Sequence, residues 1–162
     1  MLWLGRLGAD TTFTYSVESA PATATALSLA PVRKLLADTE RANTTFPSMR
    51  LSQSEDLAPA KFRINVTNTG VVDSDDVVLG FLTPPGAGTN GVPLQTLFGF
   101  ERVFVKAGAT VQVDLYPELT QFTQVRPDGT RVAAPGLYSL RFGLKETSTQ
   151  GMGYAEHSFT AA

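Results

Sequence analysis

The chain has 162 residues, no cysteine and a formal net charge of −2, with 43% hydrophobic and 17% charged residues. Its 13 Lys and Arg residues are not clustered, which excludes a basic platform for nucleic acid. The lack of cysteine excludes a disulfide framework, a thiolate zinc site and a cysteine nucleophile. Because the longest apolar run, at 77–82, is far too short to cross a bilayer, we expect neither a nucleic-acid nor a membrane partner.

Short strands separated by turn residues dominate the pattern. In chain order they are expected at 12–17, 61–68, 76–82, 100–105, 110–116, 122–126, 130–133, 137–142 and 154–160, and 25–29 is a further candidate for a short strand. In the clearest case, 61–68, Phe62, Ile64 and Val66 share one face and polar residues share the other, as in a strand with one buried face. The run at 76–82 is apolar at both parities, which predicts a central strand covered on both faces.

Three segments are predicted to lie outside the strands. The prolines and glycines of 84–91 predict a loop, and Pro127-Asp128-Gly129 predicts the turn of a hairpin. Residues 31–42 place apolar residues at helical spacing behind Pro31, so they form either one short helix or a long connection. Residues 43–59 are rich in Ser, Thr, Pro and acidic residues and are predicted to form an exposed loop.

Seven to nine short strands at regular spacing favour an all-β sandwich over an α/β fold. A chain of this length suits one domain, which we place at 12–162, with 1–11 as a linker or the remnant of a preceding domain. Arg6 and Asp10 interrupt the apolar start of the chain, so we expect no export signal in the printed residues, and the compartment stays open.

Residues that could carry catalysis or bind a metal are few. The one histidine, His157, lies in the last strand and is predicted to face water, because no nucleophile or orienting partner stands near it in the sequence. Asp73, Asp75 and Asp76 could supply oxygen ligands to Ca²⁺, yet the central Gly and closing Glu of a calcium loop are missing. We expect these carboxylates to cap local amides in a solvated turn. No metal and no cofactor is expected.

Two further kinds of site are a pair of catalytic carboxylates and an aromatic surface for binding sugars. Asp114 and Glu118 could be proposed as a glycosidase pair, but Asp114 lies on the wet face of an ordinary strand, so we expect no catalytic residue here. An aromatic platform for sugar rings would draw on five residues, most of which could equally be core. They are Trp3, Tyr15, Tyr116, Tyr138 and Tyr154. Glycosylation sequons occur at Asn43 and Asn65 and matter only in a secreted eukaryotic protein.

An ordered set of segments is more specific than any of these candidates. It consists of Phe62-Arg63-Ile64-Asn65-Val66-Thr67-Asn68-Thr69-Gly70, Asp75-Asp76-Val77-Val78-Leu79, Pro93-Leu94-Gln95-Thr96-Leu97-Phe98-Gly99-Phe100-Glu101-Arg102-Val103, Lys106-Ala107-Gly108-Ala109-Thr110-Val111 and Pro135-Gly136-Leu137-Tyr138. This succession resembles the fibronectin type III-like C-terminal domain of glycoside hydrolase family 3, which includes β-glucosidases and β-D-xylosidases. The long 39–59 region resembles in position an insertion of the xylosidase branch.

The resemblance implies a fibronectin type III/immunoglobulin-like sandwich with one long N-terminal connection. It implies a non-catalytic accessory domain that packs on the catalytic domains of a parent glycosidase, whose own catalytic residues lie upstream of the matched segment. Gly99, Phe100, Glu101 and Arg102 are the expected interdomain contact, with Phe100 as a buried anchor and Arg102 in a bidentate pair with a carboxylate. The alternative is a free-standing carbohydrate-binding or adhesion module, with a plant-type polysaccharide or oligosaccharide as partner.

Overall fold

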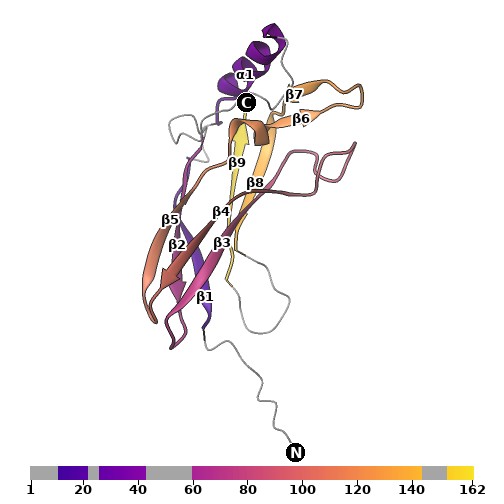
Figure 1. Ribbon diagram of the computed structural model, residues 1–162. Coiled ribbons are helices and arrows are strands. Elements are labelled where there is room, and N and C mark those ends of the chain that lie inside the picture. Colours follow the sequence, from indigo (N-terminus) through magenta and orange to yellow (C-terminus); the bar gives the residue numbers. More distant parts are fainter. Residues whose placement is uncertain (1–10, 22–25, 43–59, 144–152) are drawn as a thin grey trace, which may run out of the picture.

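The computed structural model describes residues 11–21, 26–42, 60–143 and 153–162. Two antiparallel sheets pack face to face in this part of the chain, with one helix at one end (Figure 1). The elements in chain order are β1 (Phe13–Ser19), α1 (Ala30–Arg41), β2 (Phe62–Asn68), β3 (Ser74–Thr83), β4 (Thr96–Val105), β5 (Thr110–Leu115), the 3₁₀ helix η2 (Leu119–Phe122), β6 (Thr123–Val125), β7 (Arg131–Ala133), β8 (Gly136–Phe142) and β9 (Ala155–Ala161).

The sheets follow the order β1-β2-β5 and β4-β3-β8-β9, while β6 and β7 form a separate hairpin. The predicted all-β sandwich is therefore confirmed. The candidate strand at 25–29 is not formed as such: Leu27 makes only an isolated parallel bridge to Ala161, and 22–25 lie outside the described residues. No described helix is long and apolar enough to span a membrane.

The core lies between the two sheets and follows the two-residue period of the strands. On β2 the inward residues Phe62, Ile64 and Val66 are fully buried, as the alternation predicts. The Phe62 ring contacts the rings of Phe142 on β8 and Phe159 on β9, with centroids 5.7 and 5.9 Å apart. These contacts join the middle strand of one sheet to two strands of the other, so neither sheet has an independent core.

A side-chain hydrogen bond from β1 to β3 also crosses the sandwich. Tyr15, on the inward face of β1, donates its hydroxyl to Oδ2 of Asp76 on β3, 2.6 Å away. Burial of the ring raises the pKa of Tyr15, and the hydrogen bond to the Asp76 carboxylate raises it further. The phenol therefore stays protonated and keeps donating at neutral pH.

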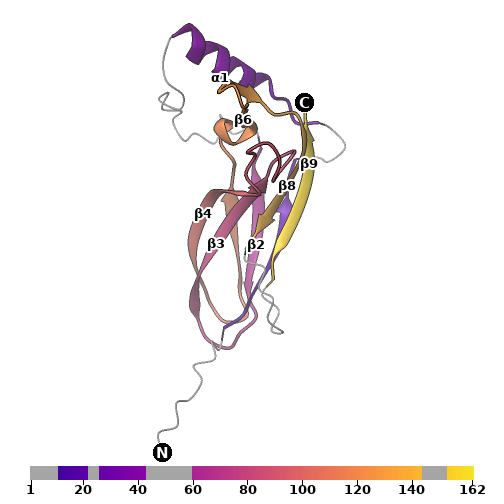
Figure 2. The same cartoon turned by 90° about the vertical axis from the view of Figure 1, so that its right-hand side faces the viewer.

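The strand β3 is central, as predicted, but it is not covered on both faces. Val78 and Leu82 face the core and are buried, whereas Val77 on the opposite face is 44% exposed. No described element packs over that outer face, because α1 lies at the end of the sandwich and not beside it (Figure 2). The apolar outer residues of β3 are therefore part of a surface that the described residues leave uncovered.

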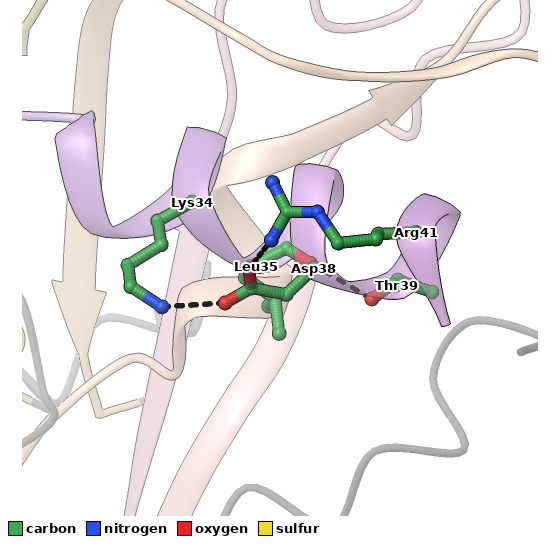
Figure 3. A network of polar contacts seen from close by, with 5 residues as sticks. All are labelled: Lys34, Leu35, Asp38, Thr39 and Arg41. Carbon is green, nitrogen blue, oxygen red and sulfur yellow. Dashed lines mark hydrogen bonds and ion pairs between the residues drawn. The ribbon is translucent and has the colours of Figure 1, made fainter. Parts of the chain in front are cut away.

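The helix α1 forms where the spacing allowed either a helix or a connection. Pro31 stands in its first turn, where the missing amide hydrogen costs no helical bond. Val32 and Leu35 are buried and pack toward β7 and η2. On the exposed side, Asp38 accepts contacts from Lys34 and Arg41, at 2.5 and 3.2 Å (Figure 3). The expected loop at 43–59 lies outside the described residues.

Candidate interdomain contact surface

The segment Gly99–Arg102 lies in β4, at the edge of the four-stranded sheet. The register pairs Phe100 with Leu79 and Arg102 with Val77, so these four residues share the outer face of the sheet. Two positions further along, Phe104 pairs with Asp75 on the same face. Glu101 has the opposite parity, and it pairs with the buried Val78.

Phe100 is not a buried anchor within this chain. It is 66% exposed and Phe104 is 56% exposed, although a strand in an ordinary outer sheet face carries polar residues there. The difference arises because both parities of 97–105 contain apolar residues, and only one parity can face the core. We call Val77, Leu79, Phe100 and Phe104, with the Arg102–Asp75 pair beside them, the outer apolar face.

Arg102 makes one ion-pair contact within the chain, from Nη2 to Oδ2 of Asp75 at 3.0 Å. Both side chains are well exposed, at 71% and 48%. A pair of this kind contributes little to folding, because water screens it. It leaves a planar guanidinium at the margin of the outer apolar face, available to a further acceptor.

A bidentate pair between an arginine and a carboxylate lies on the outer face of the three-stranded sheet. Arg63 on β2 donates from Nε and Nη2 to the two carboxylate oxygens of Asp114 on β5, at 2.8 and 3.0 Å. Lys61 adds a contact to Oδ2 at 3.1 Å. The hydrogen bonds from Arg63 lower the pKa of Asp114 to about 2. Asp114 is therefore an ionised, fully engaged carboxylate and not a general acid.

A cavity of about 250 Å³ lies between the predicted contact segment and the two carboxylates considered above as a glycosidase pair. It is lined by Gly99, Phe100 and Glu101 from β4 and by Asp114 and Glu118 from the other edge, among others. Glu118 is the N-cap residue of η2, and its backbone N–H donates a hydrogen bond to Oε1 of the Gln121 side chain at 2.7 Å. Asp114 is paired with Arg63 and Lys61, and Glu118 is the N-cap residue of η2. We therefore interpret this cavity as a packing feature and not as an acid–base site.

His157 does not face water, contrary to the sequence prediction. It lies on β9 in phase with Ala155, Phe159 and Ala161, all buried, and its ring packs edge-on against Phe62 at 5.7 Å. Its Nε2 is buried and has no hydrogen-bond partner among the described residues. In the sequence, Ala155, Phe159 and Ala161 alternate with polar residues, and His157 has the same parity as this apolar set. That alternation indicates an inward orientation for His157.

The three aspartates of the weighed calcium site point to different partners. Asp73 Oδ1 accepts the backbone N–H of Ala107 at 2.8 Å, as expected of a capping carboxylate. Asp75 pairs with Arg102, and Asp76 accepts from Tyr15 across the core. Among the described residues no group of three or more acidic or histidine side chains is arranged to hold a metal ion.

Two of the four tyrosines considered for an aromatic platform, Tyr15 and Tyr138, point inward. Tyr138 is fully buried and donates its hydroxyl to the Ala134 carbonyl at 2.6 Å, and Tyr15 is engaged with Asp76. Trp3 lies outside the described residues, as does the sequon at Asn43. Asn65 lies half-buried in the middle strand of the three-stranded sheet.

Comparison with known proteins agrees with this architecture. Residues 76–145 match the family described as a fibronectin type III-like domain. An exo-1,4-β-xylosidase of Emericella nidulans is 40% identical over 80 residues, which cover 49% of this chain and 10% of the relative. A probable exo-1,4-β-xylosidase of Aspergillus fumigatus is 37% identical over 100 residues, or 61% of this chain and 12% of the relative. The chain thus spans about a tenth of these curated relatives.

Solved structures show the same fold over nearly the whole chain. A β-glucosidase from Listeria innocua in complex with glucose superposes with a TM-score of 0.61 at 16% identity, covering 93% of this chain and 16% of that one. A GH3 β-glucosidase from Bifidobacterium adolescentis gives a TM-score of 0.56 at 20% identity, covering 93% and 17%. In each case this chain corresponds to a small part of a much larger protein.

Proposed function

We infer that this chain, which has the fold of a fibronectin type III-like domain and resembles the one in family 3 glycoside hydrolases, is the non-catalytic accessory domain of such an enzyme. We place its contact with the catalytic domains on the outer apolar face. The parent enzyme would be a glycosidase of the xylosidase or glucosidase type, acting on xylose- or glucose-containing oligosaccharides.

One observation supports this placement more than any other. Phe100 and Phe104 stand uncovered on the same outer face of the sheet, inside the segment that matches the family. Burying the exposed part of one phenylalanine contributes on the order of 1–2 kcal/mol, and two rings with Val77 form the centre of a modest interface. Arg102, at the margin, suits a carboxylate of the partner domain.

The first test is the size of the native product. An antibody against this segment, used on an extract of the source organism, should detect a band several times larger than 17.3 kDa. A band near 17.3 kDa would contradict the accessory-domain proposal and favour the free-standing module. The pure chain is also expected not to hydrolyse aryl xylosides or aryl glucosides, since no acid–base pair is assembled in the described residues.

The second test is the substitution Phe100→Ser in the full-length enzyme. We expect its thermal midpoint to fall by about 1 °C, because about 1–2 kcal/mol of interface burial is lost and the shift per kcal/mol is small in a protein of that length. In the isolated chain the same substitution should leave the thermal midpoint nearly unchanged, since Phe100 is already exposed there.

Leu137→Ser is the matched control, because Leu137 on β8 is 64% exposed and lies outside the outer apolar face. If Leu137→Ser and Phe100→Ser lower the midpoint of the full-length enzyme equally, the assigned face is wrong.

A further inference from the structure

Two hollows lie at the end of the sandwich that carries α1, on either side of one glutamine. The first hollow, of about 380 Å³, lies between the loop 84–93 and the hairpin β6–β7. The second, of about 350 Å³, is lined by other residues of the same loop and the same hairpin. Val92, Gln124 and Val125 line both hollows. Each is in the size range of small-ligand sites, and together they make one divided groove.

The loop that forms one wall is held in a defined shape by its own backbone. Gly88 donates its N–H to the Val92 carbonyl at 2.9 Å, and Val92 donates to the Thr89 carbonyl at 2.8 Å. Asn90, at φ 49°, is in the left-handed region, so the loop makes a tight turn there. Gln124 Nε2 then donates to the Pro85 carbonyl at 2.7 Å and fastens the loop to the hairpin. The groove is therefore preformed, which lowers the entropy cost of binding.

The lining combines neutral polar groups with aliphatic surface. Thr96 and Thr120 contribute hydroxyls to the first hollow and Gln121 contributes its amide NH2 group, beside aliphatic surface of Leu82, Pro84, Val92 and Pro93. The Thr123 hydroxyl is already engaged, because it donates to the Thr120 carbonyl and accepts from Arg131. Oε1 of Gln121 accepts the N–H of Glu118. Hydroxyls and amides can each donate and accept, as the hydroxyl groups of a sugar require. Of the lining residues that the structure describes, none carries a carboxylate, so the groove does not suit a hard cation. Each hollow has a single arginine, too little positive charge for a polyphosphate.

We propose that this divided groove binds a neutral oligosaccharide of two or three sugar units, with sugar hydroxyls on the threonine and glutamine side chains and ring C–H faces on the prolines. None of the residues lining either hollow is aromatic, so no ring stacks on the sugar. Binding by the isolated chain is accordingly in the millimolar range, about −4 kcal/mol. Such a weak site becomes useful when the domain is tethered to an enzyme, because tethering raises the effective concentration of the saccharide. The site does not depend on the outer apolar face, which lies elsewhere on the sheet.

The test is a titration of the ¹⁵N-labelled full chain with xylotriose, followed by backbone amide shifts. We expect saturable shifts confined to the loop 84–93, to β6 and to the residues around Thr96, with a dissociation constant of about 1 mM to 10 mM. Thr96→Leu should weaken binding about fivefold, which corresponds to one lost hydrogen bond. Gln124→Ala should weaken binding at least as much, because it also removes the hydrogen bond that fastens the loop to the hairpin.

Matched controls exist for both substitutions. Thr160→Leu changes an exposed threonine on β9, and Gln112→Ala changes an exposed glutamine on β5; neither lines the groove. Both should leave binding unchanged. Shifts that are absent, that scatter over the surface, or that appear with inorganic phosphate and not with xylotriose would overturn the proposal. The titration uses the chain alone, so its failure leaves the interdomain contact to be judged by the Phe100→Ser experiment.

Discussion

At the scale of single residues, Asp114 is a carboxylate whose surroundings strongly favour its ionised form. Arg63 and Lys61 hold it ionised, and its pKa of about 2 lies below the ordinary value of 3.8. A carboxylate whose pKa is lower in the folded state stabilises the fold above its unfolded pKa, and this contribution is lost as the pH falls. The window for the loss is therefore pH 3.8 down to about 2.

We predict that Asp114→Asn lowers the free energy of unfolding at neutral pH by about 1 kcal/mol, because partial exposure of the three side chains screens the interaction. The variant should also lose part of the stability change that the parent chain shows between pH 4 and pH 2. Urea unfolding at a series of pH values measures both effects. Asp75→Asn, which removes an exposed pair, is the control and should have little effect. Equal losses for the two variants would contradict the assignment.

His157 is the residue whose orientation the sequence prediction missed, and its buried Nε2 gives a second test. Replacing it by leucine removes an unpaired polar atom from the neighbourhood of Phe62 and Phe159. We predict that His157→Leu leaves the free energy of unfolding within about 1 kcal/mol of the parent or raises it. Phe159→Leu, which removes only ring atoms, should lower it by about 1 kcal/mol or more. A loss above about 2 kcal/mol for His157→Leu would mean that Nε2 has a partner.

At the scale of elements, α1 shows how a local pattern gains a definite structure from its contacts. The spacing of Val32, Leu35 and Thr39 is helical, but a helix of this length is marginal alone in water. Burial of Val32 and Leu35 toward η2 and β7 selects the helix over an extended connection. The 3₁₀ helix η2 was not predicted, because Leu119–Phe122 is too short to show a period.

We predict that Leu35→Ala lowers the free energy of unfolding by about 2 kcal/mol, the low end for a buried leucine, because α1 lies at the end of the sandwich. Far-ultraviolet circular dichroism should show some loss of helix while the sheets persist. Lys34→Ala, which removes one exposed ion pair of the same helix, should change stability little. A leucine variant as stable as the parent would show that α1 is not docked.

At the scale of the whole molecule, the two sheets share one core and are also joined by the Tyr15–Asp76 hydrogen bond. Contacts of this kind make separate unfolding of one sheet unfavourable. The molecule nevertheless leaves phenylalanines uncovered on one outer face, as expected of a part that packs on something larger.

We predict that urea unfolds the chain in one transition. Near-ultraviolet circular dichroism, which reports on buried tyrosines such as Tyr138, should coincide with the far-ultraviolet signal of the sheets. The slope should lie at about 1–3 kcal/mol per molar urea, as for a domain of this size. Two separated transitions would show that one sheet, or α1 with the hairpin, unfolds independently. Tyr138→Phe, which keeps the ring, is the control for the near-ultraviolet assignment.

The sequence by itself determined the strand periods, the inward set Phe62, Ile64 and Val66, the turns and the family resemblance. These follow from interactions between residues close in the chain, or from an ordered set of motifs. The covering of β3, the exposure of Phe100 and the burial of His157 were decided only by the tertiary structure. A strand with apolar residues on both faces has the same local sequence pattern whether its outer face is covered by its own chain or is exposed for another domain. Which case holds depends on what packs against it, and that is not a local property.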